Sequence, residues 1–274
     1  MVNIFNMVVI VLNFEEQVHI IPLGFEIDRA VIMFEKFSAN RVYLLVTPPD
    51  PDYQAENIEQ KHCLTEVEKK LTMKKIEVII QELDLFDIKE LMNNVSSLIL
   101  KEKSKGNVVY VNMSAGGRLA SVGATFAAMA HNAKVYYVGA NRYSRNDEER
   151  QRHGISICDK PEGMILENFQ IKLPDEPGKI VLTSICRKSK PMNTDEILTL
   201  LISNKIELFQ DEKTVGSKEE RRRIQQKNRV NLNKAILDKL DKNGYITREK
   251  LGRFNKIGLT ESGKYMANLI GRTE

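Results

Sequence analysis

The sequence predicts an α/β protein in which an open, Rossmann-like and mostly parallel sheet is followed by a winged helix-turn-helix domain. Three observations lead to this prediction. Residues 18–138 alternate short apolar, β-branched runs with segments of helical spacing, which is typical of parallel strands joined by right-handed helical crossovers. A stretch containing Pro and Gly follows at residues 173–178. Beyond it the pattern changes to helices, a long basic helix and a hairpin.

Short apolar runs bounded by polar or turn residues predict strands that are covered on both faces. The five clearest runs lie at residues 18–22, 41–46, 76–81, 108–112 and 134–138. A sixth strand is expected at residues 164–173, where the alternation is weaker. The second strand ends at a Pro-rich run, TPPDP, because proline cannot continue a ladder.

Between the strands, apolar residues recur with the period of a helix that packs on a sheet. We expect helices at residues 27–37, 56–73 and 87–101, and a helix of small residues after Gly117. The polar run at residues 141–160 predicts a loop over the carboxyl edge of the sheet or an extension on the dimer side.

The second half predicts the element order of a winged helix. A short apolar helix is expected at residues 179–187, and the run NTDE at residues 193–196 is a strong start signal for the next helix. A basic helix follows at residues 217–243 and ends at Gly244. Residues 245–259 then predict two strands around a basic tip, before a last helix.

We therefore expect two domains and a short connection. The Rossmann-like, ligand-binding domain is placed at residues 1–173, the linker at residues 174–178 and the winged helix-turn-helix, DNA-binding domain at residues 179–274.

The composition excludes several classes of protein. Of the 274 residues, 42% are hydrophobic and 28% are charged, as in globular proteins. No apolar run is long enough to span a membrane, and the apolar N-terminal segment has neither a basic start nor a cleavage site of a signal peptide. The three cysteines are far apart and form no C-x-x-C pair, which argues against a disulfide framework or a zinc site. We expect a cytoplasmic protein with no membrane partner, no metal and no cofactor.

The charge is divided unevenly between the two halves. Residues 1–174 carry 20 Lys and Arg against 23 Asp and Glu, whereas residues 213–256 carry 14 basic against 5 acidic residues. A concentrated basic tract beside an acidic half indicates a module that faces nucleic acid.

The most distinctive motif follows the strand at residues 108–112 and reads Asn112-Met113-Ser114-Ala115-Gly116-Gly117-Arg118. Here a strand ends and a helix begins, so unpaired N–H groups and the helix dipole favour an anion. The glycines allow a ligand to approach the backbone, and the Asn, Ser and Arg side chains can bind hydroxyls or phosphate oxygens. The alternative is structural: Ser114 caps the helix, and the glycines only turn the chain.

Taken together, the two halves resemble archaeal transcription regulators that join a CARF domain, the CRISPR-associated Rossmann fold, to a C-terminal winged helix. The resemblance rests on this motif and on residues 19–29, HIIPLGFEIDR. It implies a homodimer with a cyclic oligoadenylate, in the first place cyclic tetra-adenylate, across the two-fold axis. A larger ring or another nucleotide remains an alternative ligand.

The implied ligand-binding residues follow the first and fourth strands: Leu23, Gly24, Phe25, Asp28, Asn112, Ser114, Gly116, Gly117 and Arg118. The charged pair at residues 28–29 also fits a helix start. Arg142 and Tyr143 of the next loop are within the reach expected for the same ligand.

Double-stranded DNA is the partner that the basic tract predicts. The expected contacts on the basic helix are Lys218, Arg221, Arg222, Arg223, Lys227, Asn228, Arg229, Asn231 and Lys234, where the two Asn side chains are expected to read adenine edges. The expected contacts on the wing are Arg248, Lys250, Arg253 and Lys256. A solvated helix with internal ion pairs is the alternative.

These expectations combine into a ligand-gated transcription regulator that is not an enzyme. No Arg precedes a His at the spacing of the Arg-x₄₋₆-His motif, which argues against the ribonucleases often joined to CARF domains. Two alternatives stay open. The domain slowly cleaves its cyclic ligand as a ring nuclease, or the winged helix serves protein–protein contacts.

Overall fold

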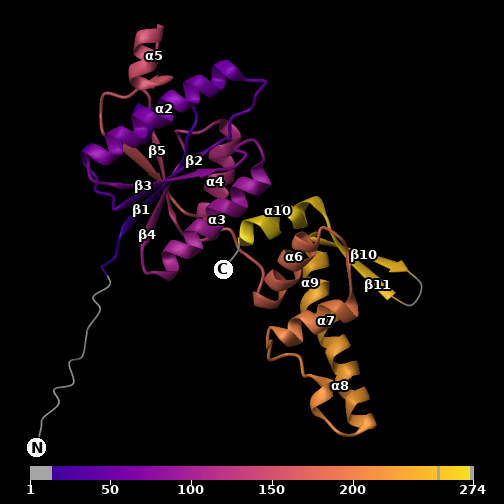
Figure 1. Cartoon of the computed structure of the whole chain (residues 1–274). Coiled ribbons are helices and arrows are strands. Elements are labelled where there is room, and N and C mark those ends of the chain that lie inside the picture. The colour runs from indigo at the N-terminus through magenta and orange to yellow at the C-terminus, as the bar shows by residue number, and fades with distance from the viewer. Residues whose placement is uncertain (1–13, 252–253, 272–274) are drawn as a thin grey trace, which may run out of the picture.

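A six-stranded sheet forms the core of the N-terminal half in the computed structural model, which describes residues 14–251 and 254–271 (Figure 1). The side chains of residues 250, 251 and 254 are outside this description. The strand order is β3-β2-β1-β4-β5-β8, and β8 alone runs antiparallel to its neighbour. The strands are β1 (Gln17–Pro22), β2 (Arg41–Val46), β3 (Glu77–Glu82), β4 (Val108–Asn112), β5 (Lys134–Val138) and β8 (Gly163–Leu166). The predicted mostly parallel, Rossmann-like sheet is thereby confirmed.

Helices cover both faces of this sheet. On one face, α3 (Ile88–Ser104) and α4 (Arg118–Ala130) pack together over β1, β4 and β5. On the other face lie α1 (Asp28–Val31), the 3₁₀ turn η1 (Ile32–Glu35) and α2 (Gln54–Met73). The single helix expected at residues 27–37 is thus split, and its middle is rich in β-branched residues that weaken a helix.

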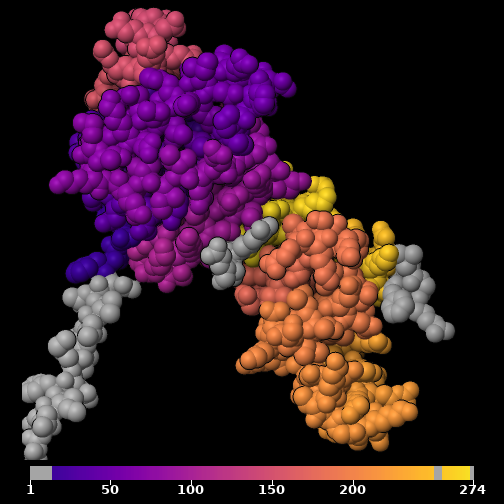
Figure 2. All heavy atoms as spheres, viewed as in Figure 1, coloured from indigo at the N-terminus to yellow at the C-terminus, as the bar shows by residue number. Residues whose placement is uncertain are grey.

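The predicted loop at residues 141–160 is a folded hairpin. Two short strands, β6 (Arg142–Tyr143) and β7 (Ser156–Ile157), pair around α5 (Asp147–His153). The α5 helix stands at the top of Figures 1 and 2. It is fastened to α2 by an ion pair between Arg150 and Glu59 and by His62 Nε2, which lies 2.8 Å from the Gln151 carbonyl oxygen.

The C-terminal half has the element order expected of a winged helix. It consists of α6 (Glu176–Lys188), β9 (Met192–Asn193), α7 (Thr194–Ser203), the turn η2 (Glu212–Thr214), α8 (Lys218–Asn231), the π-helical segment η3 (Leu232–Leu237), α9 (Asp238–Lys242), β10 (Ile246–Leu251), β11 (Phe254–Leu259) and α10 (Glu261–Ile270). The hairpin β10–β11 and β9 form a three-stranded sheet. Because Asp175 caps α6, this helix starts inside the stretch predicted as a linker.

The predicted basic helix is one continuous rod of α8, η3 and α9. Its second part buries Leu232, Ile236 and Leu240 in the core of the domain. The first part, α8, projects from the body of the winged helix, at the bottom of Figures 1 and 2. The rod therefore has a buried C-terminal part and an exposed, basic N-terminal part.

The two halves are joined through α10 as well as through the chain between them. Helix α10 packs against α3, α4 and α6, so one apolar cluster runs through both halves. The carbonyl oxygen of Leu269, near the end of α10, accepts hydrogen bonds from Ser96 Oγ at 2.9 Å and from His131 Nε2 at 2.8 Å. Ser96 belongs to α3, and His131 directly follows α4.

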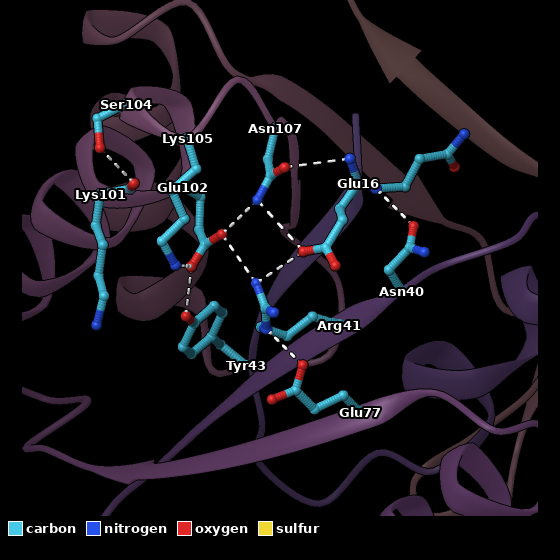
Figure 3. Close-up of polar contacts among 11 residues, drawn as sticks. Glu16, Asn40, Arg41, Tyr43, Glu77, Lys101, Glu102, Ser104, Lys105 and Asn107 are labelled. Carbon is cyan, nitrogen blue, oxygen red and sulfur yellow. Dashed lines mark hydrogen bonds and ion pairs between the residues drawn. The ribbon is translucent and has the colours of Figure 1, made fainter. Parts of the chain in front are cut away.

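A buried polar network ties the amino edge of the sheet together (Figure 3). The Glu102 carboxylate, 0% exposed, accepts hydrogen bonds from Tyr43 at 2.7 Å, Arg41 at 3.0 Å and Asn107 at 2.7 Å. Arg41 also pairs with Glu77 at 2.7 Å. Every buried charge in the network has partners, so it serves the fold rather than a ligand.

Two further observations concern the described residues as a set. Within residues 14–251 and 254–271, none of the helices combines the length and the apolar character that a membrane span requires. The same ranges hold no cluster of three or more His, Cys, Asp or Glu placed to bind a metal ion.

Candidate ligand site and nucleic-acid interface

The turn after β4 is organised by Asn112, which is fully buried. Its side-chain oxygen accepts from Ser114 N at 2.8 Å and from Ser114 Oγ at 2.6 Å, and its amide nitrogen donates to the Arg29 carbonyl oxygen at 2.9 Å. Asn112 thereby fixes the turn after β4 and joins it to α1.

Ser114 has a structural role that the sequence did not reveal. Its buried hydroxyl donates to Asn112 and accepts from Val138 N at 3.0 Å. The N-cap of α4 is Gly117, which has no side-chain cap, so the expectation that Ser114 caps the helix is wrong. The first N–H groups of α4 remain open to an anion.

The turns after β1 and β4 lie against each other at the carboxyl edge, as predicted. Gly24 N donates to the Ala115 carbonyl oxygen at 2.9 Å. A Cβ on Gly116 would lie 3.0 Å from the Cβ of Pro22, whereas a Cβ on Gly117 would meet nothing within 4 Å. Gly116 is therefore required for packing, and Gly117 faces open space.

The side chains of Leu23 and Asp28 point into the protein. Leu23 is 0% exposed and belongs to the core beneath α1. Asp28 accepts from His153 Nδ1 at 2.8 Å and from Cys158 N at 3.1 Å, so it holds the β6–α5–β7 hairpin. The prediction that the side chains of Leu23 and Asp28 contact the ligand is corrected, because both are buried in the protein. The same correction applies to the side chains of Asn112 and Ser114, which are buried with internal partners. Phe25 is half-buried beside Gly24.

A hollow of about 580 Å³ opens beside this turn. It is lined by Arg29, Tyr137 and residues 139–145, which include Arg142, Tyr143 and Arg145. Three guanidinium groups and two phenol rings thus converge at the carboxyl edge, where open α/β sheets bind their ligands. Arg118 lies exposed at the start of α4 and has no hydrogen-bond or ion-pair partner in the described part of the chain.

Two arginines of the hollow, Arg29 and Arg142, are held by different partners. Arg29 is held by Glu26 at 3.3 Å, by the Ser114 carbonyl oxygen at 3.4 Å and by the Tyr137 hydroxyl at 3.4 Å. Arg142 makes a bidentate pair with Glu149, at 2.7 and 2.8 Å. Hydrogen bonds from Arg142 and from the Arg145 backbone lower the pKa of Glu149 to about 2. This carboxylate therefore competes with an anionic ligand for Arg142.

Glu26 is a buried carboxylate behind the hollow. Burial raises its pKa, although Ser156 and the charge of Arg29 act in the opposite direction. Its oxygens accept from Ser156 Oγ at 2.7 Å and from Ser156 N at 3.0 Å. Glu26 thus fixes both Arg29 and the return strand of the hairpin.

The contribution of Arg29, Tyr137 and Arg145 to the hollow was missed in the sequence. Tyr137 carried a usable signal: it alternates with the buried Tyr136 along β5 and must face the other side of the sheet. Arg145 carried none, because its position depends on how the hairpin folds back.

Helix α8 forms the candidate nucleic-acid interface. Lys218, Arg222, Lys227 and Lys234 are exposed and have no ion-pair partner within the described residues. Arg223 faces Glu219 at 4.0 Å, with both side chains more than 80% exposed. Exposed pairs of this kind are weak, so the tip of α8 presents a basic surface.

Comparison with protein-family models gives one match in each half. Residues 17–143 match the model described as HFX_2341_N-like, N-terminal. Residues 179–271 match the DUF6293 C-terminal winged helix domain. Each half of the chain is thus similar to the domain whose model it matches. The predicted architecture, a Rossmann-like domain followed by a winged helix, is confirmed by the strand order and by the match of the C-terminal half to a winged helix model.

Among solved structures, the chain is similar to Csm6 of Enterococcus italicus bound to cyclic hexa-2'-fluoro-hexa-dAMP, with 14% identity and a TM-score of 0.39 over 69% of this chain and 49% of that one. It is also similar to Can2 of Sulfobacillus thermosulfidooxidans in complex with cyclic tetra-adenylate, with 13% identity and a TM-score of 0.36 over 92% and 63%. Protein VC1899 of Vibrio cholerae matches with 12% identity and a TM-score of 0.39 over 93% and 65%. The chain thus spans about half to two thirds of these proteins. No curated protein matches it.

Several predicted DNA contacts of the winged helix are corrected by the structure. Asn228 is 3% exposed and exchanges hydrogen bonds with the backbone of Gln210, at 2.8 and 3.3 Å. Asn231 donates to the Leu208 carbonyl oxygen at 3.1 Å. Neither side chain is free to read a base, because both hold the loop that precedes α8.

The wing of this domain is described only in part. Arg248 forms ion pairs with Asp238 at 2.8 Å and with Asp241 at 3.2 Å. These pairs hold the wing against α9, so the Arg248 side chain does not point outward as predicted. Lys256 is exposed on β11 and stays a predicted contact. Arg253 and the side chain of Lys250 lie outside the described residues.

Two further arginines of α8 have internal partners. Arg221 Nε donates to the Val215 carbonyl oxygen at 2.9 Å. Arg229 lies 3.3 Å from Asp195 of α7, and both side chains are more than half exposed. Arg221 therefore helps to anchor α8, whereas the solvated pair of Arg229 can open to admit a phosphate.

Proposed function

We propose that this protein is a homodimeric, ligand-gated DNA-binding regulator of transcription. Its HFX_2341_N-like domain binds a cyclic oligoadenylate or a related nucleotide, and its winged helix binds double-stranded DNA. The observation that carries the proposal is the hollow of arginines and tyrosines beside the open N-terminus of α4, in a chain that also bears a projecting basic helix.

The chemistry of the hollow fits a nucleotide with several phosphates. Guanidinium groups bind phosphate oxygens in two-point contacts, and tyrosine rings offer faces on which a base can stack. The open N–H groups of α4 add a further anion site. The class of cyclic ligand follows from the family resemblance of the two turn motifs.

A second copy of the chain is the expected partner of the outer face of α4. Leu119, Val122 and Phe126 lie on one side of this helix and are 39% to 44% exposed. Tyr137 and its strand partner Met164, 37% and 67% exposed, extend the apolar surface along β5 and β8. Because this surface borders Arg118, a symmetric contact brings two ligand sites together.

Calorimetry with cyclic tri-, tetra- and hexa-adenylate tests the ligand. Tight binding of one ring per dimer is expected, and light scattering reports the dimer. Arg118→Ala is expected to abolish ligand binding and to spare DNA binding without ligand. Lys101→Ala, which removes an exposed cation at the opposite edge of the sheet, serves as the matched control.

The same experiment separates the alternatives. Recovery of linear products would assign a ring-nuclease activity to the domain. A flat titration with duplex DNA, with and without ligand, would reject DNA binding and favour protein contacts for the winged helix. Binding of none of the rings would reject the ligand class.

A further inference from the structure

The orientation of α8 about its own axis is fixed by a row of side chains that face the domain. Arg221, Asn228 and Asn231 each bond to the loop before the helix, at the Val215, Gln210 and Leu208 backbone respectively. Ile224, half-buried, lies on the same side. One face of α8 is therefore closed, and the opposite face must point outward.

Gln226 stands in the middle of the outward face. It lies two residues before Asn228, which turns it about 160° away from that side chain around the helix axis. Arg222 and Arg229 lie four residues before it and three residues after it, on the same side. These side chains line a hollow of about 670 Å³ along the helix.

Gln226 is also a free amide at the centre of this face. Its side chain is exposed and has no hydrogen-bond partner among the residues that the structure describes. Asn233, further along the hollow, donates to the Arg229 carbonyl oxygen at 2.9 Å and is half-buried. Gln225 also lines the hollow, but it is turned about 100° from Gln226 toward the side of the helix.

We propose that Gln226 reads an adenine in the major groove and determines the sequence specificity of this protein. The inference rests on the proposed DNA binding and names the residue that gives it specificity. A glutamine amide presents one donor and one acceptor, which match N7 and the N6 amino group of adenine. Arg222 and Arg229, on either side, supply phosphate contacts that hold the helix in register.

This assignment replaces the asparagines that the sequence indicated. Asn228 and Asn231 carry amide groups that could pair with adenine, but these groups form hydrogen bonds with the backbone of Gln210 and Leu208. They act as positioning residues, because they decide which face of α8 meets the DNA.

The test is selection of bound duplexes from a random library with the full chain, with and without the cyclic ligand. Wild type is expected to enrich a site with an adenine in each half. Gln226→Ala should lose the preference at that one position, a change of about 5- to 150-fold in discrimination. Gln226→Glu should move the preference toward cytosine, whose amino group donates to a carboxylate. Gln225→Ala is the matched control and should leave the site unchanged.

The outcomes separate this inference from the proposed function. If wild type binds no duplex, DNA binding is rejected and the assignment of Gln226 falls with it. If wild type enriches a site and Gln226→Ala enriches the same site with the same base preferences, DNA binding stands and the assignment is overturned. Loss of the adenine preference in Gln225→Ala but not in Gln226→Ala would assign base reading to Gln225 and overturn the assignment of Gln226. Circular dichroism of each variant confirms that α8 stays helical.

Discussion

His19 shows how one buried side chain sets a pH limit on the fold. Its ring is stacked on Tyr110, with centroids 4.8 Å apart, and lies edge-on to Phe34 and Tyr136. Nδ1 is 3.2 Å from the Tyr136 hydroxyl, and Nε2 has no partner within the described residues. Burial lowers the pKa of His19 to about 4. The folded protein therefore holds this imidazole neutral.

We expect this group to make stability fall as the solution is acidified. The unfolded chain takes up a proton near the ordinary histidine pKa, but the folded chain does so only near pH 4. The free energy of unfolding is therefore unaffected by the titration of this group above about pH 6.5. Between about pH 6.5 and about pH 4 it falls by about 1.4 kcal/mol per pH unit, about 3 kcal/mol in all. Urea unfolding of wild type and His19→Phe from pH 7.5 to 4.5 measures the difference in slope. His62→Gln, at a half-buried position on α2, is the control. Equal slopes for wild type and His19→Phe would contradict the account.

Glu102 is the residue on which the amino edge of the sheet depends (Figure 3). Burial alone would raise its pKa, but hydrogen bonds from Tyr43, Lys105 and Asn107 and the charge of Arg41 hold the pKa below its usual value. Glu102→Ala leaves the Arg41 guanidinium and the Tyr43 hydroxyl without their shared acceptor. We expect a loss of about 3–5 kcal/mol in the free energy of unfolding.

Glu77→Ala is the matched control, since it removes a second carboxylate from the same arginine but one that is 56% exposed. A pair on the surface contributes at most about 1 kcal/mol. Chemical denaturation of the two variants checks the contrast. Equal losses would show that burial does not decide the strength of this network.

At the scale of elements, the sequence predicts what local pattern determines. The five parallel strands were predictable because each contains a short apolar run, which is buried on both faces in the central strands, as Val18 and Val111 are. The edge strand β3 is covered only in part, contrary to the expectation for residues 76–81. The contact between the turns after β1 and β4 was predictable because neighbouring parallel strands end at the same edge of the sheet. The winged helix was predictable from its order of elements and from the NTDE start signal, which forms a complete capping box at Asn193.

What the sequence could not predict depends on contacts between distant segments. The hairpin at residues 142–157 is mostly polar, and its fold is held by Glu26, Asp28 and Glu59 from other elements. The inward turn of Asn228 likewise depends on where the loop before α8 docks. Residue type indicated the chemistry of these positions, but only the docked structure gives their direction.

Asn228 offers a prediction about α8 as an element. Asn228→Ala removes both hydrogen bonds to the Gln210 backbone and frees α8 to rotate on its loop. We expect weaker binding to all duplexes by a similar factor, about 5-fold or more, with the base preferences retained. Fluorescence anisotropy on the selected site and on an unrelated duplex checks this. A loss confined to one base position would mean that Asn228 itself reads DNA.

At the scale of the whole molecule, α4 connects the candidate ligand site to the winged helix. Its first turn carries Gly117 and Arg118 at the hollow, and His131 after its last turn binds the Leu269 carbonyl of α10. Burial lowers the pKa of His131, and the nearby charges of Lys179 and Lys103 add to this effect, although the hydrogen bond to Leu269 acts in the opposite direction. The imidazole is thus held neutral, as a donor through Nε2. A shift of α4 by a bound anion therefore reaches α10 directly.

We expect Ser96→Ala combined with His131→Ala to uncouple the two halves, because it removes both hydrogen bonds to Leu269 and leaves each binding surface intact. Affinity for the cyclic ligand and affinity for DNA, measured separately, should stay close to wild type. The factor by which ligand changes DNA affinity should fall from the 5- to 150-fold range of typical allosteric coupling to about 1. Lys89→Ala, which breaks an exposed ion pair with Glu261 at 3.7 Å on the same interface, should keep the coupling. Because coupling is reciprocal, the change in ligand affinity caused by DNA must fall by the same factor. A double variant that keeps the full ratio would show that the signal passes through the dimer contact and not through α10.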